Sequence, residues 1–175
     1  MAYFEDLSEY SYLDSYFYRP RTKNIGWLDA THEVPKSAPT DDELDLVWAY
    51  CKTSIAQTRG VHDCEMCPVA TSYYVKRNDE PLLLGTSEIR VFGTDGTIYA
   101  APTLIYHYIS VHHYKPPDEF LLALREGPRP PSEEYFDRLR ELDLEWRPTS
   151  APATKPFRSG DVQSPGGGWK REIVG

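Results

Sequence analysis

The sequence predicts an α+β fold in which a small antiparallel β-meander packs against about four helices. Three observations lead to this prediction. A helix-start motif is followed by apolar residues at helical spacing, and three β-like runs are separated by turn sequences. After these runs, prolines mark the boundaries of further helices. The 175 residues suffice for a packed core. A chain of roughly 150 residues already buries about two-thirds of its unfolded surface.

The first 39 residues alternate between aromatic and polar side chains, and prolines interrupt them. We expect extended segments wrapped on the core, with the aromatic rings as anchors. A platform that stacks nucleic-acid bases would need a basic groove beside it, and the sequence provides none. The aromatic residues concerned are Tyr3, Phe4, Tyr10, Tyr12, Tyr16, Phe17, Tyr18 and Trp27.

Thr40 and Glu43 form a capping box, which predicts the start of a helix. The apolar residues that follow lie at helical spacing and predict one buried face, and Gly60 is a plausible stop. Cys51 belongs to this face, so we interpret it as a core residue and not as a metal ligand. The face consists of Leu44, Val47, Trp48, Cys51 and Ile55.

Three β-like runs, residues 69–76, 87–92 and 97–100, predict the meander. Asn78-Asp79 and Thr94-Asp95-Gly96 supply the turns between them.

Three further helices follow the meander. Pro102 suits the first turn of a helix that runs to about His113, where Pro116 and Pro117 stop it. A second helix is predicted over residues 118–125, and Ser132 caps a third, whose buried face is Tyr135, Leu139 and Leu142. Residues 1–146 are therefore predicted to be a single α+β domain, and the Pro/Gly-rich residues 147–175 an extended or flexible tail.

Composition excludes several classes of protein. With 27 acidic against 19 basic residues the formal charge is −8, which disfavours nucleic acid as a partner. The sequence has no run of ~18 apolar residues to span a membrane, and its beginning lacks a signal-peptide pattern. We expect a cytoplasmic protein. In that reducing compartment, three cysteines indicate metal or redox chemistry more than disulfides.

Cys64, Cys67, His107 and His112 form the candidate metal site. Two cysteines with two residues between them allow both thiolates to reach one ion, and His107 and His112 have the spacing seen in two-Cys, two-His zinc sites. The predicted cofactor is structural zinc. At ~100° per residue the two histidines lie about 140° apart, so both reach one ion only if the last helical turn tightens or unwinds.

Both histidines flank the apolar stripe of Leu104, Tyr108 and Val111, whereas His113 points to the solvated side and is the weakest ligand candidate. Alternatives remain open: inert thiols, a redox pair, or a site in which His62 replaces one helical histidine. A thioredoxin-like pair would need a helix directly after the cysteines, where Pro68 and a β-like run stand. A zinc deaminase would need His-x-Glu and Pro-Cys-x-x-Cys motifs, which are missing.

The chain resembles a family of uncharacterised bacterial proteins over roughly residues 3–125. The resemblance rests on the Cys-x-x-Cys motif and on Tyr-Ala-x-Pro-x-Leu-Ile-x-His-Tyr-x3-His, together with residues 3–8, 24–28, 88–91 and 99–120. It implies a bacterial origin and a shared fold but no reaction.

The sequence leads to two functional hypotheses. The first is a zinc-stapled protein, in which the ion ties distant segments together, that acts by binding another protein as a regulator, immunity factor or accessory factor. The second is a metal-dependent hydrolase with Glu88 or Glu65 as general base and water at an open coordination position. Four protein ligands close a zinc site and three leave it open, so ligand count distinguishes them.

Overall fold

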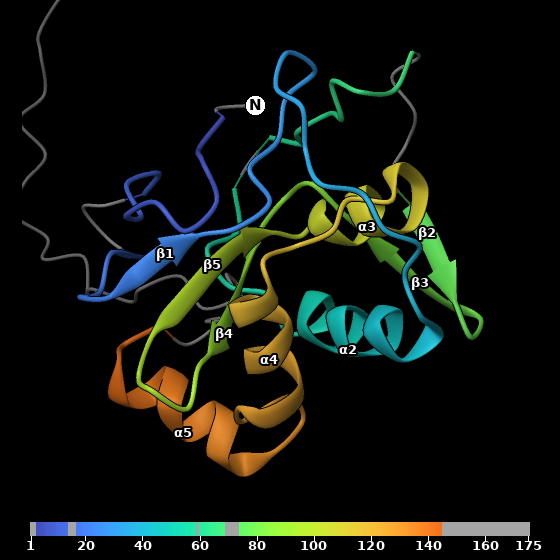
Figure 1. Ribbon diagram of the computed structural model, residues 1–175. Coiled ribbons are helices and arrows are strands. Elements are labelled where there is room, and N and C mark those ends of the chain that lie inside the picture. Colours follow the sequence, from blue (N-terminus) through green and yellow to red (C-terminus); the bar gives the residue numbers. More distant parts are fainter. Residues whose placement is uncertain (1–2, 14–16, 59, 69–73, 145–175) are drawn as a thin grey trace, which may run out of the picture.

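The computed structural model describes residues 3–13, 17–58, 60–68 and 74–144. These residues contain four helices and five strands, and the strands form two small sheets (Figure 1). The predicted α+β class is confirmed. In chain order the elements are β1 (Thr22–Asn24), α2 (Asp41–Lys52), β2 (Tyr74–Arg77), β3 (Glu80–Leu83), β4 (Glu88–Phe92), β5 (Ile98–Pro102), α3 (Ile105–His112), α4 (Asp118–Glu126) and α5 (Glu133–Glu141).

Helix α2 starts as predicted. The Thr40 hydroxyl accepts a hydrogen bond from the Glu43 N–H at 3.2 Å, and the Glu43 carboxylate accepts one from the Thr40 N–H at 3.0 Å. Cys51 is 1% exposed, and its Sγ lies 3.6 Å from the Thr103 carbonyl oxygen. The interpretation of Cys51 as a core residue is confirmed.

The predicted extent of α2 is wrong, because the helix ends at Lys52 and not near Gly60. Ile55 has left the helix and pairs with the first residue of β4. Its N–H donates to the Glu88 carbonyl at 2.7 Å, and its carbonyl accepts from the Glu88 N–H at 2.9 Å. Helical spacing of Ile55 was therefore a coincidence: sheet pairing buries the same side chain.

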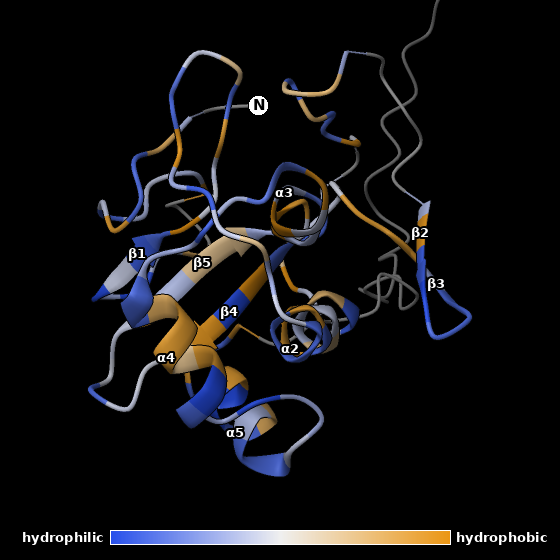
Figure 2. Ribbon diagram, turned by 45° about the vertical axis from the view of Figure 1, so that its right-hand side comes forward, coloured by the Kyte–Doolittle hydropathy of each residue, from blue (hydrophilic) through white to orange (hydrophobic). Residues whose placement is uncertain are grey.

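The single meander is also corrected. Asn78 and Asp79 both have positive φ, 50° and 62°, and a two-residue turn of this kind closes a tight hairpin between β2 and β3. Strand β3 was not predicted, since residues 80–83 contain a proline. Strands β4 and β5 pair with each other in a second sheet of order β1-β5-β4. Figures 1 and 2 show the β2–β3 hairpin apart from this sheet.

Strand β1 comes from the aromatic N-terminal segment and pairs with β5 in parallel, with Thr22 opposite Ile98. The predicted wrapping of this segment on the core is confirmed by the burial of Tyr10 and Trp27, each 1% exposed. Trp27 also donates its indole N–H to the Ala100 carbonyl at 3.2 Å. The segment therefore covers part of the three-stranded sheet.

The two faces of the three-stranded sheet are covered differently. On one side lie α2 and α4, and the rings of Tyr99 and Phe120 meet edge to face at 5.8 Å. On the other side lies a buried ion pair, in which Arg90 Nη1 contacts Glu88 Oε2 at 2.7 Å. The Tyr10 hydroxyl lies 3.0 Å from both oxygens of Glu88 and completes this buried cluster.

The prediction that Pro102 opens a helix is wrong, because Pro102 ends β5 and α3 begins at Ile105. Proline is tolerated there, where the strand ends opposite Glu88. Beyond it, the Thr103 N–H still donates to the Ser87 carbonyl at 2.9 Å. Strand β5 therefore leads through a single turn into the helix that carries both candidate histidines.

Helices α4 and α5 match their predictions, and the Ser132 side chain accepts a hydrogen bond from the Tyr135 N–H at 3.2 Å as the cap of α5.

The predicted tail, residues 147–175, lies outside the described residues. Among the helices that the structure describes, none is long and apolar enough to cross a membrane.

Candidate metal centre

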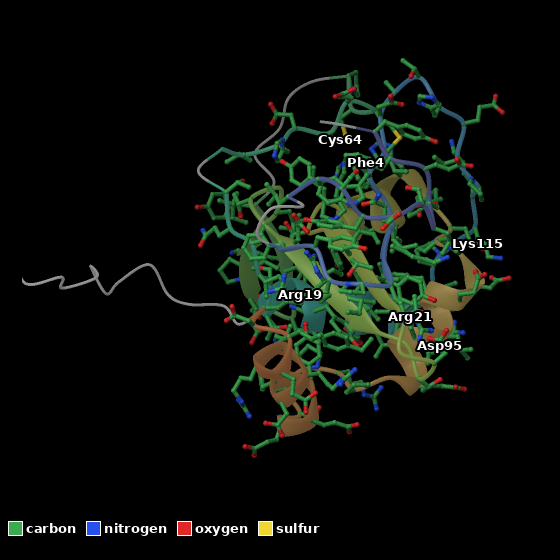
Figure 3. All side chains as sticks on the ribbon, turned by 90° about the vertical axis from the view of Figure 1, so that its left-hand side faces the viewer. Phe4, Arg19, Arg21, Cys64, Asp95 and Lys115 are labelled. Carbon is green, nitrogen blue, oxygen red and sulfur yellow. The ribbon has the colours of Figure 1, made fainter. Side chains whose placement is uncertain are left out.

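The two cysteines lie on a turn formed by Glu65 and Met66, in a loop that lacks helix and strand. This loop is held against the segment between β3 and β4, because the His62 N–H donates to the Gly85 carbonyl at 2.8 Å. Gly85 has a φ of +80°, and a Cβ there would lie 2.5 Å from the His62 carbonyl oxygen. Close approach of the two backbones thus requires glycine, and it fixes the cysteine turn near the end of β5. Figure 3 shows Cys64 near the top of the molecule, well above Arg21 and Asp95.

Helix α3 resolves the 140° separation expected between His107 and His112. Its last turn is wider than an α-turn, because the His113 N–H bonds to the Tyr108 carbonyl, five residues back, and the Tyr114 N–H reaches the same carbonyl at 3.0 Å. Turns of this kind, with a residue in the left-handed region, are a common way for a helix to end. Such a turn brings side chains five residues apart toward one side, and His113, at a φ of +56°, then ends the helix.

The four predicted donor atoms converge on one point. His112 Nε2 lies 3.3 Å from Cys64 Sγ and 3.4 Å from Cys67 Sγ, and His107 Nε2 lies 3.3 Å from Cys67 Sγ. The two Nε2 atoms are 3.2 Å apart, and all four donors lie within 4.8 Å of one another. With bonds of about 2.0–2.3 Å, tetrahedral zinc separates its ligand atoms by about 3.3–3.8 Å. The arrangement therefore has the dimensions of a tetrahedral metal site and could hold an ion.

Burial sets the protonation of this cluster. His107 is 7% exposed, and its desolvation, aided by the neighbouring His112, lowers its pKa to about 4. Desolvation also lowers the pKa of His112, helped by Lys36 and His113. Both imidazoles are then neutral at pH 7, the form that binds metal. Burial raises the pKa of the Cys64 thiol to about 11, so an ion that binds must displace its proton.

The structure does not bring the other candidates into this group. His62 Nε2 lies 3.0 Å from the Tyr12 hydroxyl, and His113 is exposed. Glu88 is 2% exposed and held by Arg90, and Glu65 is exposed. In the described part of the chain, the two cysteines and two α3 histidines are the one group of His, Cys, Asp and Glu side chains that could hold a metal.

One expectation about α3 is wrong, since Val111 was assigned to the buried stripe and is 54% exposed. Tyr12, which was predicted only as an aromatic anchor, contacts His62 in the cysteine loop, and Gly85 was not predicted to have a role. A glycine between β-like runs is a signal for close backbone approach that could have identified Gly85.

The chain has a counterpart among known protein families. Residues 2–125, which include all four donors, match a family model described as a domain of unknown function, DUF7919. No curated protein and no solved structure matches the chain.

Proposed function

Since the chain belongs to this family of domains of unknown function, we propose from its own geometry that it is a zinc-stapled protein that acts by binding another protein. The observation that carries the proposal is the convergence of two sulfur and two nitrogen donors within 4.8 Å. Thiolate and imidazole together in a tetrahedral set favour zinc over magnesium or calcium, which prefer oxygen ligands.

The ion would fasten the cysteine loop to α3. These segments are far apart in sequence, and Cys64 and Cys67 lie on a loop without regular structure of its own. Binding free energy at such a site stabilises the folded chain, because the unfolded chain does not hold the four donors together. We therefore assign the ion a structural role.

The number of protein donors at the site disfavours the hydrolase alternative. Four protein donors fill the tetrahedron and leave no position for an activated water. Glu88 is also unsuited to act as a general base at this site, because its carboxylate is buried and bound by Arg90 and Tyr10.

A protein partner is supported by apolar side chains beside the ligands. Val61, three residues before Cys64, is 51% exposed, and Val111, next to His112, is 54% exposed. Exposed apolar side chains gathered in one patch mark interaction sites, and we propose that these two valines belong to such a patch. Reduced cysteine ligands require a reducing compartment, so we place the protein in the cytoplasm, as a regulator, immunity factor or accessory factor.

Metal analysis tests the staple. The protein purified under reducing conditions should contain about one zinc per chain. The variants Cys64→Ser and His107→Ala should lose it, whereas Cys51→Ala, which changes a buried cysteine outside the cluster, should keep it. Zinc retained by Cys64→Ser, or an absence of metal from the wild-type protein, would refute the proposal.

The interface is tested separately. Proteins that co-purify with the wild-type chain should be lost from Val61→Asp with Val111→Asp, while zinc content and melting temperature stay unchanged. If the same proteins bind the double variant equally well, the partner uses another surface.

A further inference from the structure

We propose that Cys64 and Cys67 form a reversible redox switch, in which a hydroperoxide converts the two metal-binding thiols into a disulfide and thereby expels the ion. The inference rests on the proposed zinc site and adds a regulation to it. The substrate class is a small hydroperoxide, such as hydrogen peroxide.

The geometry of the two sulfurs permits the bond. Cys64 and Cys67 occupy the first and last positions of a turn whose central residues are Glu65 and Met66. Across a β-turn the outer Cα atoms lie within about 7 Å, and a disulfide spans about 4.4–6.8 Å between Cα atoms. The two Sγ atoms already lie within 4.8 Å of each other. A small movement of the turn suffices to join them.

The two thiols differ in access. Cys64 is 4% exposed, whereas Cys67 is partly exposed, so an oxidant reaches Cys67 first. The third cysteine, Cys51, is 1% exposed in α2, its Sγ lies 3.6 Å from the Thr103 carbonyl oxygen, and it is not part of the donor group. Oxidation susceptibility follows exposure. The pair therefore has one accessible attacking thiol and one adjacent resolving thiol.

The reaction balances without a further reagent. The Cys67 sulfur attacks one peroxide oxygen, the O–O bond breaks, and Cys67 sulfenic acid and water form. The Cys64 sulfur then attacks Cys67 Sγ, hydroxide leaves and takes up a proton as water, and the disulfide is complete. In the zinc-loaded protein both sulfurs are thiolates. They are oxidised by two electrons, and one peroxide takes up two protons from solvent and is reduced to two waters. A thiol reductant reverses the step by exchange.

Loss of the ion follows from the ligand count. A disulfide sulfur is a poor metal ligand, because the thiolate is the binding form. Oxidation thus removes two of the four donors and leaves only His107 and His112, which lie on one short helix. The cysteine loop then loses its connection to α3, and the surface that carries Val61 loses its support.

The experiment treats zinc-loaded, reduced protein with hydrogen peroxide and measures released zinc with a colorimetric chelator. Peptide mass spectrometry maps the oxidised residues. Diamide, which oxidises thiols but not methionine, serves as a second oxidant. Met66→Leu is the matched control, because Met66 lies in the same turn and could itself be oxidised. A Cys51→Ala variant tests for participation of the third thiol.

We expect about one zinc released per chain, a Cys64–Cys67 disulfide, and rebinding of zinc after reduction. Diamide should have the same effect, and Met66→Leu and Cys51→Ala should respond like the wild type. Zinc that stays bound while the thiols remain reduced overturns the switch but leaves the staple intact. Release that disappears in Met66→Leu assigns the effect to methionine and also overturns it. Reduced protein that holds no zinc refutes both proposals.

Discussion

His112→Ala should remove the ion, because the His112 Nε2 atom neighbours all three other donor atoms. Its Nε2 lies within 3.4 Å of both sulfurs and 3.2 Å from His107 Nε2. Alanine leaves three donors around a site built for four. We expect loss of zinc together with the stability that zinc supplies.

The size of that loss follows from mass action. A ligand present at 100 to 1,000 times its dissociation constant stabilises the fold by about 2.7–4.1 kcal/mol. For a domain of this length, each kcal/mol changes the melting temperature by about 2–4 °C. His112→Ala should therefore melt about 5–16 °C below the zinc-loaded wild type.

Thermal unfolding followed by circular dichroism, with and without a chelator, isolates the metal contribution. The chelator should lower the melting temperature of the wild type by the same amount as the substitution does. It should have no effect on His112→Ala. The two perturbations are not additive if both act through one ion.

His113→Gly is the control, since His113 is exposed and not a ligand, and glycine accepts its φ of +56°. Alanine would be a poorer control because a left-handed conformation costs it about 1 kcal/mol. His113→Gly should keep both zinc and the response to chelator. A chelator effect that persists in His112→Ala would show that the ion is bound elsewhere and refute the reasoning.

Three further predictions concern stability in urea. Burial lowers the pKa of His107 to about 4, so the unfolded chain takes up a proton that the folded, metal-free chain does not. The stability of the metal-free chain should therefore be complete above pH 6.5 and fall by roughly 3 kcal/mol as the pH drops toward 4. His107→Gln should weaken this dependence and leave the part that comes from His112. Glu88→Gln leaves the buried charge of Arg90 without its counter-ion and should cost about 3–5 kcal/mol, against under about 1 kcal/mol for the exposed Glu80→Gln. Thr40→Ala removes the cap of α2 and should cost about 1 kcal/mol; an unchanged urea midpoint would contradict the capping role.

The sequence predicted well those features of the fold that depend on interactions between residues close in the chain, such as helix caps. Thr40 and Ser132 satisfy the first amides of their helices, and this needs no tertiary context. The four candidate donors were predicted from residue type and spacing alone, and the structure brings them together as a group that could hold a metal. Their convergence could not be predicted in detail, because the wide turn closed on the Tyr108 carbonyl is not visible in helical periodicity.

Pairing between distant segments was beyond the reach of the sequence patterns. Strand β1 is only three residues long and exists because β5 offers it a parallel edge. The local sequence at Ile55 and at Pro102 is compatible with a helix and with a strand. In the structure both residues pair with the sheet and lie outside the helices. Tertiary pairing overrides local preference at such positions.

The parallel pairing of β1 with β5 has a consequence for the order in which the molecule forms. Thr22 pairs with Ile98, so β1 has only its local bridge to Glu9 until β5 has been synthesised. Loop closure over this distance is slow, and contacts of high sequence separation delay folding. During that interval Tyr10 and Trp27 lack the sheet that buries them in the native protein. These two rings therefore reach their buried positions only after β5 has formed.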